Sequence, residues 1–434
     1  MCAKSPRQDE IDRSVIVWRA KGEEEALSSF RGTAMNYSHS RQLYDRAKVI
    51  PGRSMTRSKA PGRLFDIEAG PLYAAEGQGA VLIDVDGNEY IDMLCGLGAI
   101  SIGYGMTGGL PHAVYSLPHH TEVDTAEAVL EYVAPWATSC RFTKTGSEAL
   151  QAAYMVAKAV RKERAESSSR VLVGAASYHG WHEWTNHATR YPLDADLDAL
   201  VADLERFRVF DPEPFAVFVE PPRWTSVNAS WLQHVREFCT RTGALMVMDE
   251  MIYGGRWALG GATELCGVLP DLACFGKAIG NGAPIACVVG NEALDRYGDL
   301  ASGTYSGEVS SLVSVVEVLD RYATEPVIET LWVRGRQLQE GLLAAVQAWN
   351  VADAATESRG ITARGPVHLE GAPVHQRLRF ADPRYGKLFA AAMAQRGVLW
   401  HPDCCNVCFA HSREQIDRVI EVAVASVSEV GDVR

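Results

Sequence analysis

The sequence lacks any apolar run that approaches the roughly 20 residues a helix needs to cross a bilayer. Its first residues, MCAKSPRQDEIDR, lack the apolar core of a secretory signal peptide. No stripe of basic residues is present either, and the formal net charge of −12 argues against nucleic acid as a partner. We therefore expect a cytoplasmic protein that binds neither membranes nor nucleic acid.

Two further absences limit the classes of protein to which this sequence can belong. No GxGxxG follows an early strand-like segment, which excludes the usual nicotinamide-binding fingerprint, and no internal repeat or low-complexity tract is present. The chain of 434 residues, with 47% apolar and 22% charged residues, is long enough for a large core and favours two structural lobes.

The ten cysteines are scattered along the chain, and we expect most of them to be small buried apolar residues. The densest group is Cys404, Cys405 and Cys408, which includes a CxxC spacing. A zinc site would need further ligands, and only His401 and His411 lie close in sequence. We predict no metal site, while a pocket-lining or redox-sensitive role for one of these thiols stays open.

Strand-like and helix-like segments alternate from about residue 90 to 325. This alternation predicts an α/β protein with a mostly parallel sheet covered by helices, and active groups at the carboxyl ends of the strands. Shorter strands and two helices near the C-terminus predict a smaller lobe, which the N-terminal hairpin joins. The expected strands are 170–177, 215–220, 244–249 and 286–290; the expected helices are 147–164, 194–206, 230–242, 308–323, 385–396 and 413–428.

A lysine and an aspartate suggest one kind of chemistry. Lys277 follows an apolar segment in DLACFGKAIGNGAP and is flanked by small residues, a suitable place for an amine that forms an imine with a carbonyl. Asp249, in ALMVMDE, ends a buried strand and could keep a pyridine nitrogen protonated. Together they indicate pyridoxal phosphate, joined to Lys277 as a Schiff base.

Two other segments supply what this cofactor needs. In RFTKTGSEALQAAYM, a strand-like run turns at Gly146 and Ser147 into a helix, whose free N–H groups and dipole suit a phosphate. In RVLVGAASYHGW, Tyr178 follows a buried strand and could lie flat against the cofactor ring. His179 and Gly180 are expected to shape that turn.

The order of KTGSEA, SYHGW, VEPP, MDE and FGKAIGNGAP resembles the class III aminotransferases among the fold-type I pyridoxal-phosphate enzymes. The resemblance is to the branch that includes glutamate-1-semialdehyde aminomutase. It extends from about Ser40 to the end, through YDRAKVIPGR, GAVLIDVDGNEYIDML, GTYSGE and VCFAHS. It implies an arm with part of a small domain at 1–89, a large cofactor-binding domain at 90–325, and a small domain at 326–434.

The resemblance also implies roles for individual residues. Lys277 would hold the cofactor and then move protons between the substrate carbon and the cofactor. Glu220, in VEPP, would lie near the cofactor or Asp249 rather than on a surface. Thr304, in GTYSGE, matches a threonine that completes the phosphate cup of the neighbouring subunit, which implies a homodimer with shared active sites. Arg256 could make a structural ion pair or contact substrate, and Lys144 could be cofactor-adjacent or solvated.

Departures from the aminomutase pattern bear on the substrate. Lys59, with Arg57 and Arg63 as rivals, falls where the aminomutase has a carboxylate-gripping arginine, and HPDCCNVC replaces an aromatic–glutamate pair. Glu308 replaces an asparagine and, with Asp403, would favour cationic or hydroxyl-rich ligands. YSLPHHTEVDTAE and the lysine of FTKTGS look like a sub-branch that aminates sugar-derived carbonyls.

We therefore predict a pyridoxal-phosphate-dependent aminotransferase that moves an amino group from an amino acid to an aldehyde or ketone, such as an amino-sugar or aminocyclitol carbonyl. An isomerase, either aminomutase or epimerase, would need the same residues around the cofactor. A non-catalytic protein on this fold is the third alternative, and the presence of Lys277, Asp249 and Tyr178 argues against it.

Overall fold

The structure is a computed structural model. It describes residues 35–47, 61–64, 66–106, 120–164, 169–191, 213–224, 228–357, 365–401 and 404–432. These lie almost wholly in one compact unit, residues 37–434.

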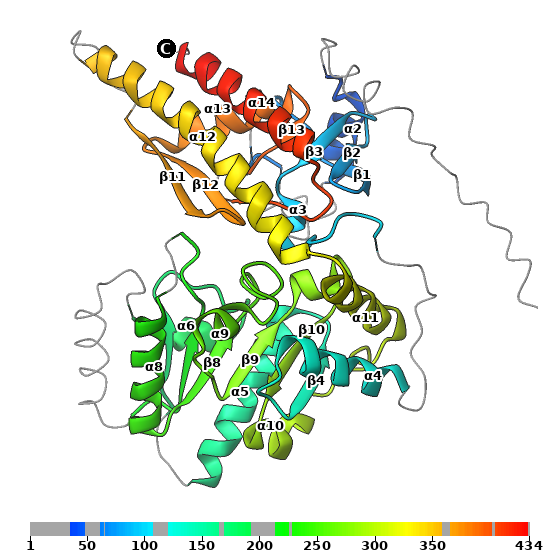
Figure 1. Cartoon of the computed structure of the whole chain (residues 1–434), viewed down its shortest axis with the longest axis vertical. Helices are drawn as coiled ribbons and strands as arrows, with labels where there is room; N and C mark the ends of the chain where they lie inside the picture. The colour runs from blue at the N-terminus through cyan, green and yellow to red at the C-terminus, as the bar shows by residue number, and fades with distance from the viewer. Residues whose placement is uncertain are drawn as a thin grey trace, which may run out of the picture. The chain divides into compact units, whose positions relative to one another are not determined.

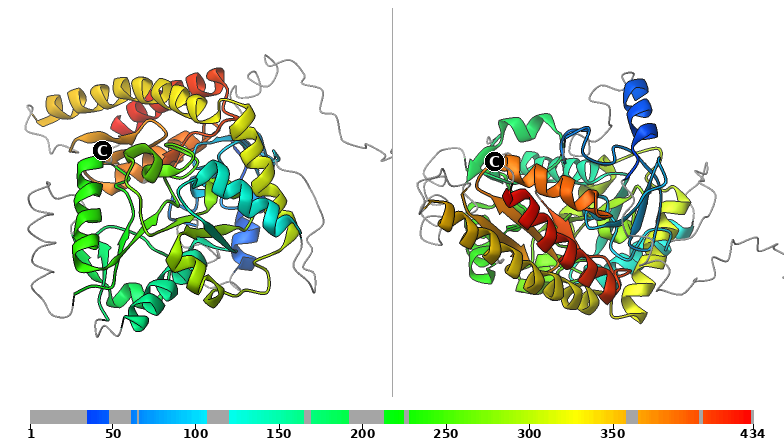
Figure 2. Two further views of the ribbon diagram at one scale, coloured as in Figure 1. Left: turned by 60° about the horizontal axis from the view of Figure 1, so that its bottom comes forward. Right: turned by 90° about the horizontal axis from the view of Figure 1, so that it is seen from above.

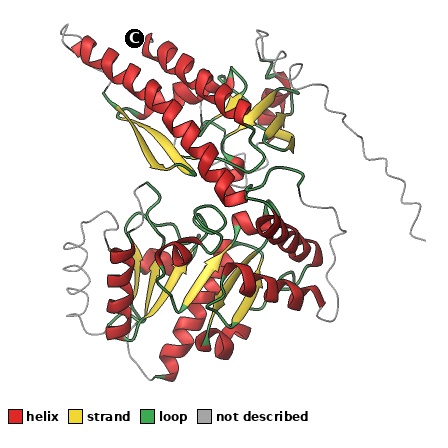
Figure 3. Ribbon diagram, viewed as in Figure 1, coloured by secondary structure: helices red, strands yellow, loops and turns green. Residues whose placement is uncertain are grey.

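In this described part, seven strands form the largest sheet (Figures 1 and 3). β10 runs antiparallel to both of its neighbours, and all other neighbouring strands are parallel, which confirms the predicted mostly parallel sheet. In sheet order the strands are β4 (Ser139–Thr143), β10 (Ala286–Gly290), β9 (Leu272–Phe275), β8 (Leu245–Asp249), β7 (Ala216–Val219), β5 (Val171–Gly174) and β6 (Thr189–Tyr191).

The apolar runs of these strands arise because both faces of the sheet are buried. Along β8, Leu245 and Val247 enter one core with helix α5 (Gly146–Glu163), while Met246 and Met248 enter another with α8 (Ala229–Thr242). Alternate side chains point to opposite faces of a strand, so a strand between two cores must be apolar throughout. The other elements associated with this sheet are α4 (His120–Ala128), η4 (Val129–Val133), α6 (Glu183–His187), α9 (Gly261–Cys266), η5 (Lys277–Gly280), α10 (Glu292–Tyr297), η6 (Gly298–Leu300) and α11 (Val309–Thr324).

Two smaller sheets are also present, and one of them combines strands from both ends of the chain. The N-terminal strands are β1 (Ala74–Gln78), β2 (Val81–Asp84) and β3 (Glu89–Asp92), and β3 pairs in parallel with β13 (Val398–Leu399). The third sheet contains β11 (Val367–Ala372), β12 (His375–Phe380) and β14 (Cys405–Asn406). The predicted joining of the N-terminal hairpin to the C-terminal segment thus appears as direct strand pairing, whereas the domain bounds stay a prediction.

The helices of these segments are α2 (Ser38–Arg46), α3 (Cys95–Gly98), α12 (Val327–Glu357), α13 (Pro383–Ala394) and α14 (Arg413–Asp432). Helices α12 and α14 lie side by side (Figure 2), and the Gln337 amide donates hydrogen bonds to Arg413 O and to the Asp417 carboxylate. The predicted helix at 194–206 lies outside the described residues. No described helix has the length and apolar character needed to span a bilayer.

Candidate active site

The site forms where the parallel strands end. Asp249 is the last residue of β8, Glu220 follows β7, and the loop that carries His179 follows β5. Because these three strands are neighbours and parallel, their carboxyl ends meet at one edge of the sheet.

A buried histidine holds the aspartate. Nδ1 of His179 lies 2.8 Å from Oδ2 of Asp249, and the two residues are only 3% and 1% exposed. Oδ1 of Asp249 accepts the N–H of Met251 at 3.2 Å. His179 was expected only to shape a turn, so the sequence analysis missed this role. The available signal was its position after a strand parallel to the one that Asp249 ends.

Glu220 is also buried and organises the next loop. It accepts the backbone N–H of Tyr178 at 2.8 Å and two hydrogen bonds from the guanidinium of Arg223, at 2.8 and 2.9 Å. Tyr178 itself is 60% exposed. Its backbone is therefore fixed while its ring stays available to a ligand; stacking on the cofactor remains a prediction.

The turn before α5 has the form predicted for a phosphate site. A capping box links Thr145 and Glu148: the Thr145 hydroxyl accepts the Glu148 N–H, and the Glu148 carboxylate accepts the N–H groups of Lys144 and Thr145. The N–H groups of Gly146 and Ser147 are not part of this box, which leaves them and the helix dipole for an anion.

Close glycine contacts bring this turn to the lysine loop. A Cβ on Gly146 would lie 2.8 Å from Sδ of Met251, and so would a Cβ on Gly276, the residue before Lys277. On the other side, a Cβ on Gly180 would lie 2.6 Å from Oγ of Ser147. The phosphate turn thus packs directly on the Tyr178 loop, and it shares Met251 as a neighbour with the lysine loop.

Lys277 lies in the left-handed backbone region, with φ of 48°. A lysine there is unusual and strained, and such residues concentrate at functional sites. Burial lowers the pKa of its amine, although the carboxylates of Asp249 and Glu220 oppose this shift. A lower pKa leaves more of the amine neutral, which is the form that attacks a carbonyl.

The structure resolves the residues whose roles were open. Arg256 is 1% exposed and donates to two backbone carbonyls, of Val407 at 2.8 Å and Gly98 at 3.0 Å, rather than to a carboxylate. It therefore ties chain segments together. The Lys144 ammonium forms an ion pair with Glu308 at 3.1 Å, so Lys144 is not a solvated surface cation.

Glu308 is buried as expected, but its oxygens serve the protein. It caps α11, accepting N–H and hydroxyl bonds from Ser310 and Ser311 besides the bond from Lys144. Burial alone would raise the pKa of Glu308, yet these hydrogen bonds hold it well below its usual range. The expectation that Glu308 accepts hydrogen bonds from the substrate is corrected to a helix cap.

Other predicted residues have no assigned contact at this site. Thr304 is exposed in the loop before α11, so its contact with a partner's phosphate stays a prediction. Arg63 is exposed, while Arg57, Lys59 and Asp403 lie outside the described residues.

Two of the thiols and a histidine form a buried cluster, and two of its three members follow β14 in the chain. Among the described residues, Cys95, Cys408 and His411 place their ligand-type atoms within 4.8 Å of one another. Nδ1 of His411 accepts the N–H of Cys408 at 2.9 Å, and the Cys95 thiol donates to the carbonyls of Asp92 and Asn406. These bonds already engage Nδ1 and the Cys95 thiol, so we assign no metal to this cluster.

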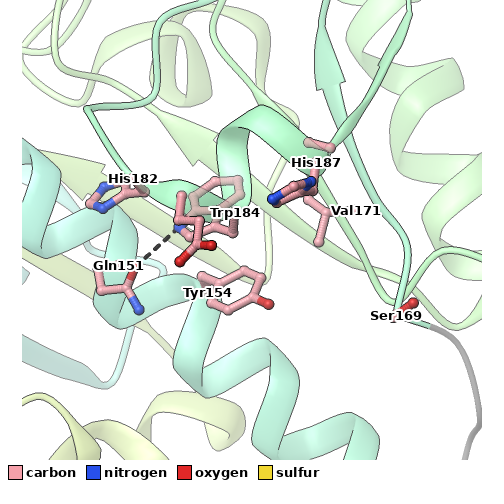
Figure 4. Close-up of a pocket in the computed structure, with 9 residues that line it drawn as sticks. Gln151, Tyr154, Ser169, Val171, His182, Trp184 and His187 are labelled. Atoms are coloured by element: carbon pink, nitrogen blue, oxygen red, sulfur yellow. Dashed lines mark hydrogen bonds between the residues drawn. The ribbon is translucent and has the colours of Figure 1, made fainter.

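A pocket of about 440 Å³ is lined mainly by residues of α5 and α6 (Figure 4). Within it the rings of Tyr154 and Trp184 stack at 5.0 Å, and Trp184 donates a hydrogen bond to Gln151. Neither Lys277 nor Asp249 lines it, so this pocket is separate from the catalytic cluster.

The residues at the sheet edge fit pyridoxal phosphate. The helix N-terminus at Gly146 offers N–H groups for the phosphate, and Asp249, held by His179, offers a buried carboxylate for the pyridine nitrogen. Lys277 provides the amine, and the bound cofactor would act as the electron sink for the reacting carbon.

The family model for "Aminotransferase class-III" matches residues 66–213 and 185–401. The chain is 28% identical to glutamate-1-semialdehyde 2,1-aminomutase of Natronomonas pharaonis, covering 89% of this chain and 99% of the relative. It is 26% identical to 3-aminobutyryl-CoA aminotransferase of Cloacimonas acidaminovorans, covering 91% and 98%.

Solved structures share the fold. The FumI protein of Sphingopyxis sp. MTA144, with pyridoxal phosphate, superposes with a TM-score of 0.76 at 24% identity, covering 91% of this chain and 96% of that one. An omega-transaminase from Sphaerobacter thermophilus gives 0.75 at 20% identity, covering 91% and 100%. The chain therefore belongs to the class III aminotransferases, as a pyridoxal-phosphate-dependent enzyme of fold-type I whose sequence resembles the glutamate-1-semialdehyde aminomutase branch.

Proposed function

We propose that this enzyme transfers an amino group from an amino-acid donor to the carbonyl of a sugar- or aminoglycoside-like acceptor, as part of secondary metabolism. One observation carries the choice of acceptor: the guanidinium groups nearest the lysine are already engaged. Arg223 gives two hydrogen bonds to Glu220, and Arg256 gives two to backbone carbonyls. An acidic substrate such as glutamate-1-semialdehyde needs a charged partner for its carboxylate. Arg223 is already paired with the Glu220 carboxylate, and both terminal nitrogens of Arg256 already hold backbone carbonyls.

The chemistry follows from the lysine and its neighbours. Lys277, with its lowered pKa, can hold the cofactor and afterwards accept and return the proton of the substrate carbon. Asp249 would hold the protonated pyridine nitrogen of the bound cofactor, and His179 holds Asp249 in place. Glu220 keeps the backbone of Tyr178 in place, so that its exposed ring can cover the cofactor.

We also propose a homodimer with shared active sites, located in the cytoplasm. The exposed position of Thr304 supports the shared site, because a residue that serves a partner subunit must lie on the surface of its own chain.

The decisive test compares acceptors. Purified enzyme loaded with pyridoxal phosphate is first incubated with a panel of amino donors, and formation of the pyridoxamine form is followed by absorption. An oxidised aminoglycoside and glutamate-1-semialdehyde are then compared as acceptors. We expect faster turnover of the oxidised aminoglycoside; much faster turnover of the semialdehyde would overturn the proposed acceptor.

An aminomutase is the alternative function. It is favoured by the 28% identity, over nearly the full length, to glutamate-1-semialdehyde 2,1-aminomutase of Natronomonas pharaonis. In the same assay, an aminomutase would convert the semialdehyde without consuming any external amino donor, whereas a transferase would need the donor in stoichiometric amount.

A further inference from the structure

His375, the first residue of β12, is held between aromatic rings near the catalytic lysine. Its imidazole stacks on Trp224 at 4.7 Å with an interplanar angle of 16°, and lies 5.7 Å from the ring of Trp257. Trp224 directly follows Arg223, the partner of Glu220. His375 thus packs on the residue next to Arg223, which binds the buried Glu220 carboxylate.

The hydrogen-bond network determines which ring nitrogen carries the proton. Nδ1 of His375 lies 2.7 Å from Oδ1 of Asn406, while Nδ2 of Asn406 donates to the carbonyl of Leu94 at 3.1 Å. The amide oxygen therefore faces the ring, so Nδ1 must donate its proton to it. Nε2 is consequently an unprotonated acceptor.

This acceptor has no partner among the described residues, although His375 is only 3% exposed. Burial lowers the pKa of the imidazole to about 3, and the nearby charges of Arg256, Arg223 and Lys277 reinforce the shift. The ring therefore stays neutral at every pH at which the enzyme would work. A buried acceptor without a donor is destabilising, which points to a ligand as the source of the donor.

We propose that Nε2 of His375 accepts a hydrogen bond from a hydroxyl group of the carbonyl substrate and so determines specificity. This inference rests on the proposed function and sharpens it: the substrate carries a hydroxyl, or an equivalent N–H, within reach of the reacting carbonyl. A carboxylate cannot satisfy Nε2, because both groups only accept. The atom is covered by protein, so substrate binding must move a neighbouring side chain aside.

The test uses pairs of aldehydes that differ by one hydroxyl, from glycolaldehyde and acetaldehyde up to an oxidised aminoglycoside and its deoxy counterpart. For the pair whose hydroxyl meets His375, we expect the wild-type enzyme to favour the hydroxylated member by about tenfold in kcat/KM. His375→Phe keeps a flat ring for stacking. In this variant the ratio of the two kcat/KM values should fall to near one, because kcat/KM falls for the hydroxylated substrate alone.

His234→Phe is the matched control, because His234 lies on α8 and its Nδ1 contacts a backbone carbonyl of its own helix. An equal loss on both members of each pair in His375→Phe would mean a structural role and overturn the inference. Absence of any hydroxyl preference in a wild-type enzyme that does aminate these aldehydes would overturn it too, while leaving the transferase intact.

A binding measurement separates this inference from the proposed function. If the enzyme aminates none of the aldehydes, the aminotransferase proposal fails, and the holoenzyme is titrated with the parent aminoglycoside. The nitrogen-15 resonance of Nε2, assigned by its loss in His375→Phe, should move on binding. An unmoved resonance at saturation would refute a hydrogen bond to this atom.

Discussion

Lys277 combines two properties that a lysine rarely has in a folded protein. Its backbone is left-handed, and burial lowers the pKa of its amine. Neither helps the protein to fold, since a left-handed residue with a side chain and a buried amine both carry a cost. Both suit a group that must form and break a bond with a carbonyl.

Replacing Lys277 with alanine should lower turnover by more than about a hundredfold, because alanine supplies neither the imine nor the proton transfer. Stability should not fall, since alanine has the same backbone strain and removes the buried amine. Visible absorption after addition of pyridoxal phosphate, together with the amino-donor half-reaction, measures the effect. Lys277→Arg keeps the charge and should be equally inactive; an unchanged visible band in the alanine variant would contradict the assignment.

His179 should act on catalysis through Asp249. In His179→Leu the buried carboxylate loses a donor, which should lower kcat by about tenfold to a hundredfold. His179→Asn offers an amide N–H in place of Nδ1 and should recover most of this loss. Steady-state kinetics of the two variants decide the matter, and equal loss in both would show that the ring matters for packing rather than for its hydrogen bond.

At the scale of elements, charged side chains lie at the ends of helices and strands. The capping box of α5 and the Glu308 cap of α11 each satisfy backbone N–H groups and are joined by the bond between Lys144 and Glu308.

Beside Asp249, Glu250 accepts the N–H groups of Ala262 and Thr263 in α9. Burial raises the pKa of Glu250 to about 7.

This raised pKa predicts a pH dependence of stability. The folded state holds the Glu250 proton up to about pH 7, whereas the unfolded state releases it near pH 4.5. The stabilisation from this group is therefore complete below pH 4.5 and lost as pH rises to about 7, by up to roughly 3 kcal/mol.

Denaturant unfolding of the holoenzyme at several values between pH 5 and 8 measures this dependence. Glu250→Gln should be less stable overall, because the side-chain NH2 group would face a backbone N–H group and two donors cannot bond. Since glutamine cannot ionise, the free energy of unfolding of this variant should fall less steeply as pH rises. Parallel pH curves for the variant and the wild type would exclude Glu250 as the titrating group.

At the scale of the whole molecule, segments from both ends of the chain are tied to the region of the large sheet. Arg256 of the large sheet region binds carbonyls at Gly98 and Val407, and β3 pairs with β13. Thr304 lies in an exposed loop, and we expect this loop to reach the phosphate site of a second copy of the chain.

Mixing two inactive variants tests the shared site. Thr304→Glu should repel the phosphate of the neighbouring subunit, and Lys277→Ala inactivates its own. In a heterodimer one site combines both defects and the other has neither, so an equimolar mixture should recover about a quarter of wild-type activity. Assays after subunit exchange measure the recovery.

The control mixture combines Lys277→Ala with Asp249→Ala, two defects of the same subunit's site, and should stay inactive because no heterodimer contains an intact site. A fully active monomer in light scattering would refute the shared site altogether.

The sequence by itself determined the parts that local chemistry dictates. Apolar runs between two cores, a Thr-Gly-Ser turn before an amphipathic helix, and a lysine after a buried strand each follow from residues close together in the chain. These local patterns, in their order, were enough to predict the mostly parallel sheet, the family and the cofactor.

Only the tertiary structure decided which distant groups meet. His179 reaches Asp249 across 70 positions of the chain, Lys144 reaches Glu308 across 164, and His375 reaches Asn406 across 31. No periodicity encodes such pairs, because strand order and the packing of loops at the sheet edge set them. For the same reason Glu308, read in sequence as a ligand for substrate, is in the fold a helix cap paired with a lysine.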